Sequence, residues 1–198
     1  MFKKVSVSLF YCAVLVIASQ SLGATTIPPV KSARIAQNAV VGELKKFDAA
    51  TKTAVVKLAD GTEEVFKLTE KTAVHGVESG AKMAALAGKE GGQFIVHYTV
   101  KGAEKTADSF KYLGAEVPRV AKGTVSGVDK AGHTIAVKTS DGAVDTYHLS
   151  EKCVLDTGKG IAEGSDAVGK TVKDGASITV HYTAEGGKKV AHLVKQAF

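Results

Sequence analysis

The stretch FIVHYTV, residues 94–100, shares the tetrapeptide VHYT with ITVHYTA, residues 178–184. Both stretches have the apolar, β-branched character of a strand, in which successive side chains point to opposite faces. We therefore expect the valine and tyrosine of each copy to face a core. The two histidines, His97 and His181, are expected on the polar outer face of the same strands.

The VHYT pair belongs to a longer internal repeat. At an offset of 81 residues Gly42 aligns with Gly123, and after three extra residues in the second copy the offset becomes 84. The repeat predicts two homologous units, residues 40–114 and 123–198, of ordinary domain size. A short junction, residues 115–122, connects them.

Each unit carries strand, turn and helix signals in the order β-β-β-α-β-β. Asp60-Gly61 and Asp141-Gly142 are strong hairpin-turn signals. The Ala-rich segments that follow the third strand indicate a short helix ended by Gly88 or Gly169. The order predicts a mainly β protein of two tandem five-stranded OB-like barrels, each with one short helix after the third strand. SH3-like barrels are the alternative.

The first strand of each unit departs from strict alternation. In VGELKKFD and KGTVSGVD the apolar residues are three apart, which predicts a β-bulge near Lys45-Lys46 and near Ser126-Gly127. The pattern G-x-[LV]-x-x-[FV]-D followed by T-x-x-V-K-x-x-D-G resembles small exported bacterial OB-like barrel domains of unknown function. The resemblance covers both units as a tandem duplication and implies a barrel fold, without an activity to assign to any residue.

The N-terminus has the pattern of a secretory signal peptide. Two lysines precede an apolar stretch, Val5–Ala18, and small residues follow. This stretch is shorter than the roughly 20 residues of a membrane-spanning helix, so cleavage is favoured over a retained anchor. We expect residues 1–24 to be the signal peptide and 25–39 an extended N-terminal arm. The protein is then exported to the periplasm or the cell exterior, without a transmembrane segment after cleavage.

The cysteine content and the charge of the two units argue against a disulfide and against nucleic-acid binding. Once the signal peptide with its Cys12 is removed, Cys153 is the remaining cysteine, so we expect a buried thiol and no intramolecular disulfide. Residues 40–114 contain 11 lysines and 10 acidic residues, and residues 123–198 contain 9 of each, with no arginine in either. Neither unit has the basic face of a nucleic-acid-binding protein, and that class is disfavoured.

The histidines are the candidate site. If each hairpin has a two-residue loop, counting back places His97 opposite Asp108 and His181 opposite His192, with Cβ atoms about 5 Å apart. His148 approaches His192 if the third and fifth strands pair. Such groups can bind Cu²⁺ or Zn²⁺, so His181, His192 and His148 are a candidate weak metal site and His97 with Asp108 a candidate paired surface site. The alternative is a pair of solvated cross-strand contacts.

Motifs typical of enzymes, such as HExxH, CxxC and GxSxG, do not occur in the sequence. We expect a non-enzymatic binding or structural module whose partner is an unknown protein, an envelope polymer or a small ligand. A periplasmic carrier of a small ligand or of copper or zinc is the alternative. A third hypothesis is electrostatic binding to an acidic polymer through Lys31, Arg34, Arg119 and Lys122.

Overall fold

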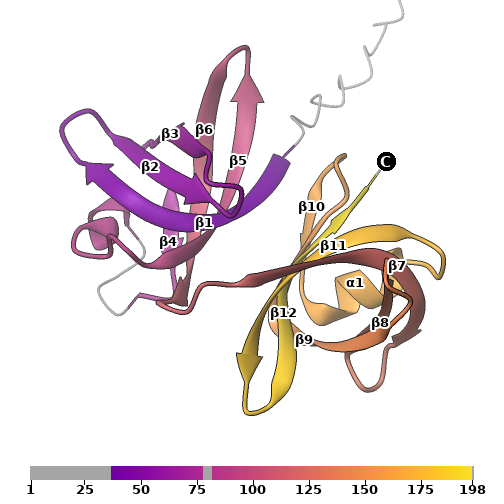
Figure 1. Cartoon of the computed structure of the whole chain (residues 1–198). Coiled ribbons are helices and arrows are strands. Elements are labelled where there is room, and N and C mark those ends of the chain that lie inside the picture. Colours follow the sequence, from indigo (N-terminus) through magenta and orange to yellow (C-terminus); the bar gives the residue numbers. More distant parts are fainter. Residues whose placement is uncertain (1–36, 78–81, 198) are drawn as a thin grey trace, which may run out of the picture. The chain divides into compact units, whose positions relative to one another are not determined.

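The computed structural model describes residues 37–77 and 82–197, which form two six-stranded sheets within one compact unit (Figure 1). The predicted signal peptide and most of the predicted arm lie outside the described residues. Sheet A contains β1 (Gln37–Asp48), β2 (Thr53–Leu58), β3 (Glu63–Lys67), β4 (Ala73–His75), β5 (Gln93–Lys101) and β6 (Glu104–Gly114). Sheet B contains β7 (Arg119–Asp129), β8 (Thr134–Thr139), β9 (Val144–Asp156), β10 (Ile161–Glu163), β11 (Ser177–Glu185) and β12 (Lys188–Gln196).

Sheet B has the strand order β10-β9-β12-β11-β7-β8, and β9 also pairs with β8. This second pairing closes five of its strands into a barrel. The order in sheet A is β3-β2-β1-β5-β6-β4, and β3 meets β6 in parallel at Lys67 and Thr106. The prediction of a mainly β fold is therefore confirmed, with a closed barrel in sheet B and a similar arrangement in sheet A.

The first strand of each sheet exchanges partners at a glycine. Gly42 pairs with Phe94 of β5 on one side and with Leu58 of β2 on the other. Gly123 likewise pairs with both β11 and β8. A Cβ atom at Gly42 would lie 2.5 Å from the carbonyl oxygen of Lys57, and one at Gly123 would lie still closer to that of Lys138. Only glycine permits this close approach of the two strands.

The predicted bulges and turns are confirmed. The pairing of β1 with β2 shifts register between Leu44 and Lys46, and that of β7 with β8 shifts between Val125 and Gly127. In both hairpin turns the glycine has a positive φ, as a tight turn requires. The strands start earlier than expected, because β1 begins at Gln37, within the predicted arm, and β7 begins at Arg119, within the predicted junction.

The helices differ from the prediction. In sheet B, α1 (Ser165–Thr171) continues past Gly169, so Gly169 does not end it. A Cβ there would lie 3.3 Å from Lys130 Cγ, so this glycine permits close packing. The equivalent part of sheet A forms only a 3-10 turn, η1 (Met83–Leu86). No helix within residues 37–77 and 82–197 is both long enough and apolar enough to cross a membrane.

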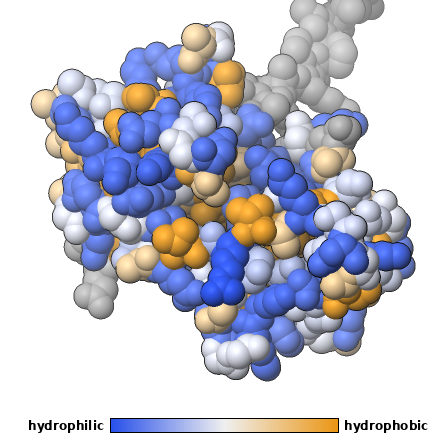
Figure 2. Space-filling view, in the orientation of Figure 1, coloured by the Kyte–Doolittle hydropathy of each residue, from blue (hydrophilic) through white to orange (hydrophobic). Residues whose placement is uncertain are grey.

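Each sheet encloses an apolar core. The core of sheet B includes Val168 and Val172 at the helix α1, which covers one end of the barrel (Figure 1). Cys153 is fully buried in the same core, and burial raises the pKa of its thiol to about 12. The thiol is therefore un-ionised and structural. Apolar residues reach the surface only as small areas among hydrophilic ones on the face in Figure 2.

Candidate functional site

The valine and tyrosine of each VHYT copy face a core, as predicted. In sheet A, Tyr98 packs edge-on against Phe66, with ring centroids 5.1 Å apart. The ammonium of Lys105 lies 5.7 Å from the Tyr98 ring centroid and 2.5 Å from a carboxylate oxygen of Glu64. Burial raises the pKa of Tyr98. The side chain is a packed element of the core and its rim.

The same arrangement occurs in sheet B with equivalent residues. Tyr182 packs edge-on against Tyr147 at 5.0 Å, and the Lys189 ammonium lies 5.9 Å from the Tyr182 ring and 2.6 Å from Asp145. Burial, with the neighbouring Asp145 carboxylate, raises the pKa of Tyr147. The tyrosine of VHYT thus has a structural role in both sheets, and core packing explains why the valine and tyrosine recur in the two copies.

His97 faces away from the core of sheet A, but it is only 8% exposed. The outer face of β5 is covered, because Ile95 belongs to an apolar cluster with Val154 and Leu193 of sheet B. The expectation of a solvated polar face is therefore wrong for His97. Its Nδ1 lies 3.6 Å from Glu163 Oε1. Burial lowers the pKa of His97 and the nearby Glu163 opposes that effect.

The predicted histidine pairs are not directly opposed. Both hairpins have the expected two-residue loops, but each contains a second bulge immediately after the histidine. His97 consequently pairs with Ser109, and His181 pairs with Leu193. Asp108 and His192 are the extra residues of the two bulges. The register prediction was wrong because the bulge shifts the count by one residue.

Each bulged residue has its own surroundings. Asp108 has a buried Oδ2 without a hydrogen-bond partner among the described residues, and burial raises the pKa of this carboxyl. His192 Nε2 lies 2.7 Å from Thr183 Oγ1 and 3.4 Å from Glu185 Oε1. The Thr183 hydroxyl donates to Glu185 Oε1 at 2.8 Å. With the Thr183 hydroxyl donating to Glu185, the imidazole Nε2–H donates to Thr183.

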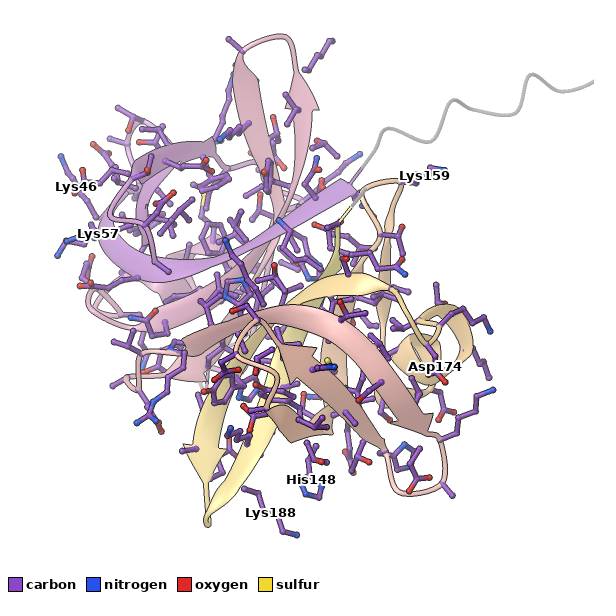
Figure 3. All side chains as sticks on the ribbon, turned by 45° about the vertical axis from the view of Figure 1, so that its right-hand side comes forward. Lys46, Lys57, His148, Lys159, Asp174 and Lys188 are labelled. Carbon is purple, nitrogen blue, oxygen red and sulfur yellow. The ribbon has the colours of Figure 1, made fainter. Side chains whose placement is uncertain are left out.

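His148 lies on β9 opposite Val190 of β12, which confirms that the third and fifth strands pair. Its side chain points outward from the sheet (Figure 3). Within the described part of the chain, no group of three or more His, Cys, Asp or Glu side chains is arranged to hold a metal ion. Metal binding by His148, His181 and His192 therefore remains a prediction.

His181 lies in a pocket of about 350 Å³, which we call the His181 pocket. Its walls include Val41, Leu58, Val120, Lys122 and Lys195. The imidazole Nδ1 is buried and has no hydrogen-bond partner among the described residues. Burial, with a smaller effect of the Lys195 charge, lowers the pKa of His181 to about 4. The pocket therefore combines a neutral imidazole side chain with apolar walls, the two ammonium groups of Lys122 and Lys195, and the carboxylate of Asp60.

A buried carboxylate beside this pocket was not identified from the sequence. Asp156 Oδ2 accepts a hydrogen bond from the Ala39 N–H at 3.1 Å and lies 3.5 Å from the Lys195 ammonium. Lys195 also donates to the Ala39 carbonyl oxygen at 3.0 Å. The two side chains thus satisfy both backbone groups of Ala39. The available signal was an acidic residue that directly follows the apolar run Cys153–Leu155.

We expect Asp156→Ala to destabilise the protein by about 2 kcal/mol, because it leaves the Ala39 and Gly158 N–H groups without their acceptor and removes the carboxylate beside the Lys195 ammonium. Urea unfolding at neutral pH measures the change. Asp174→Ala is the matched control, since Asp174 is exposed beyond α1 (Figure 3). Equal stabilities of the two variants would contradict the structural role of Asp156.

No family model matches the chain, and a search of curated proteins also gives no match. Among solved structures, 32 chains are similar. One is apo-CusF from Escherichia coli, at 14% identity and a TM-score of 0.30, covering 41% of this chain and 90% of that one. Two Ag(I)-bound CusF structures match at 13% and 14% identity, with TM-scores of 0.29 and 0.30. They cover 38% and 41% of this chain and 96% of their own.

Proposed function

We propose that the protein is an exported, non-enzymatic binding protein built from two tandem OB-like barrels, and that its ligand occupies the His181 pocket. The barrel proposal is supported by the equivalent strand orders, the bulges at matching positions and the partner-exchange glycines Gly42 and Gly123. A parallel pairing of the third and fifth strands occurs in both sheets. This pairing favours the OB-like arrangement over the SH3-like alternative.

The proposed export rests on the sequence of residues 1–24, in which lysines, an apolar stretch and small residues follow in the order of a signal peptide. Cleavage of this segment would release the mature chain into the periplasm or outside the cell. The partner we favour there is a small ligand, with an envelope polymer or another protein as the other classes.

The observation that carries the binding proposal is the unpartnered Nδ1 of His181. A buried polar atom without a hydrogen bond costs about 1–3 kcal/mol, and such atoms are rare in native proteins. The side chain that carries this atom lines a pocket large enough for a small molecule. A ligand that hydrogen-bonds to Nδ1 and places apolar atoms against Val41 and Val120 would offset that cost.

We propose binding without catalysis because the described side chains that resemble a catalytic triad already use their protons in hydrogen bonds with one another. The nearest likeness to a hydrolase site is Thr183, His192 and Glu185. Thr183 is only 3% exposed, and its hydroxyl donates to Glu185 rather than to the imidazole. A nucleophile needs an accessible oxygen and a base that accepts its proton.

Weak binding of Cu²⁺ or Zn²⁺ is the second candidate, and one observation favours it. Burial keeps His181 neutral at physiological pH, and neutral imidazole is the form that coordinates metals. The other proposed ligands are less available, since His192 Nε2 is engaged by Thr183 and Glu185. Further ligands would have to come from the ion's own water or from a bound molecule.

Native mass spectrometry of the mature protein, purified from its native compartment, tests both candidates. We expect the wild type to carry a small-molecule adduct that His181→Leu loses, because leucine removes Nδ1 while keeping apolar volume. His75→Leu is the control, since His75 is exposed and outside the pocket. A copper or zinc adduct lost in the same variant would support the second candidate. No adduct in the wild type, or one retained by His181→Leu, would overturn both.

A further inference from the structure

Sheet B carries a second, open groove of about 640 Å³ on the strands β7, β8 and β11. We call it the sheet B groove. Its lining includes Lys122, Thr124, Lys138, Thr139, Ser140 and Ser177. Strand register explains how these side chains meet: Thr124 lies between Lys138 on β8 and Ser177 on β11, and Lys122 lies beside Thr179.

An equivalent groove exists in sheet A, but other residues of the same chain partly fill it. That groove measures about 190 Å³ and is lined by Val41, Glu43, Lys57, Leu58, Ala59 and Gln93. Through the repeat, these six residues align in order with the six named for the sheet B groove. Lys122 therefore stands where sheet A has Val41, and Thr124 where it has Glu43. Hydroxyl residues stand where sheet A has Leu58, Ala59 and Gln93. The junction residues Val117 and Pro118, together with His181, close the sheet A groove. Pro118 is buried there.

The charges of the two grooves differ. In sheet A the described lining residues include one lysine, Lys57, and one carboxylate, Glu43, which forms an ion pair with Lys45. In sheet B the described lining residues include the lysines Lys122 and Lys138, and none of them is acidic. Both lysines are exposed, and neither makes an ion pair with another described residue. The neighbouring carboxylate, Asp141, is already engaged by the Thr139 hydroxyl and the Ala143 N–H.

The chemistry of the groove selects the ligand class. Two unpaired ammonium groups favour an anion, and serine and threonine hydroxyls both donate and accept hydrogen bonds, as the hydroxyls of a sugar do. None of the described residues that line the groove is aromatic, so none of them offers a nucleobase a surface for stacking. We infer that the sheet B groove binds a hydroxyl-rich polymer that carries anionic groups, carboxylate or phosphate.

Isothermal titration of the full mature protein at low salt tests this inference. The probes are polygalacturonate for carboxylate, phosphorylated dextran for phosphate, and dextran as the neutral control. We expect at least one anionic probe to bind and dextran not to bind. The double variant Lys122→Gln/Lys138→Gln should weaken that binding about tenfold, since each exposed ion pair contributes up to about 1 kcal/mol, and added salt should weaken it further.

Lys57→Gln is the matched control, because Lys57 is the sheet A counterpart of Lys138 and its side chain points away from that sheet (Figure 3). It should keep wild-type affinity. Lys122 and Thr179 line both the sheet B groove and the His181 pocket, and His181→Leu distinguishes the two sites, because it changes a residue of the pocket alone and should keep affinity for the polymer. Absence of binding to both anionic probes, an unchanged affinity in the double variant, or an equal loss in Lys57→Gln would overturn it.

Discussion

Gly123→Ala and Gly42→Ala are each expected to destabilise the protein by about 3 kcal/mol, the upper end of the usual range for overpacking. The physical reason is the contact of two backbones. A Cβ at Gly42 would stand 2.5 Å from the carbonyl oxygen of Lys57, and Gly123 faces Lys138 even more closely. A carbonyl group in a paired strand cannot move aside as a flexible side chain can, so relief requires separation of the strands.

Gly127→Ala is the control for these two substitutions. Gly127 lies in the bulge of the same strand as Gly123, yet nothing stands within 4 Å of its Cβ position, and its φ is not positive. Alanine there should leave the free energy of unfolding unchanged or raise it slightly, because alanine lowers the conformational entropy of the unfolded chain. Urea unfolding of the three variants is the measurement. A Gly123→Ala protein as stable as Gly127→Ala would show that β7 does not exchange partners at that residue.

Acidification from pH 7 to pH 4 is expected to remove about 3 kcal/mol of stability through His181 alone. The pKa of His181 is about 4 in the folded protein, because burial disfavours the imidazolium, against 6.5 in the unfolded chain. Above pH 6.5 both states are neutral and this stability is fully present. Between 6.5 and 4 the unfolded chain binds the proton first, so stability falls with pH. Burial also lowers the pKa of His97 and of His192, which adds in the same direction.

The comparison of wild type with His181→Gln isolates this effect, since the carboxyl groups titrate equally in both proteins. The variant should lose about 3 kcal/mol less than the wild type between pH 7 and pH 4. His75→Gln, at an exposed position, should show the full wild-type loss. If His181→Gln loses as much stability on acidification as the wild type, His181 is not held neutral by burial.

Much of the fold could be predicted because its determinants are local. The three-residue spacing of Leu44 and Phe47 predicts a bulge, which the structure contains, because a strand can change face only by inserting a residue. The Asp-Gly pairs mark hairpin turns since their glycines must take positive φ. Alternation in VHYT correctly separates Tyr98 and Tyr182 from the histidines.

The candidate site could be predicted only in part, because its features depend on contacts distant in sequence. No local pattern marks the second bulge, which moved Asp108 and His192 out of direct pairing with the histidines. The burial of His97 follows from the packing of the outer face of β5 against residues of sheet B, and one strand's alternation cannot show what covers its other face. Asp156 is found only once Ala39 is seen to contact it.

The central claim is that a ligand hydrogen-bonds to His181 Nδ1, and the ¹⁵N resonances of the histidine rings test it most directly. The labelled mature protein, isolated with its ligand, is compared with the same protein unfolded, freed of small molecules and refolded. The account predicts that the Nδ1 resonance of His181 moves when the ligand is removed, while the resonances of the exposed His75 ring stay in place. An unchanged His181 Nδ1 resonance in the two samples would contradict the account.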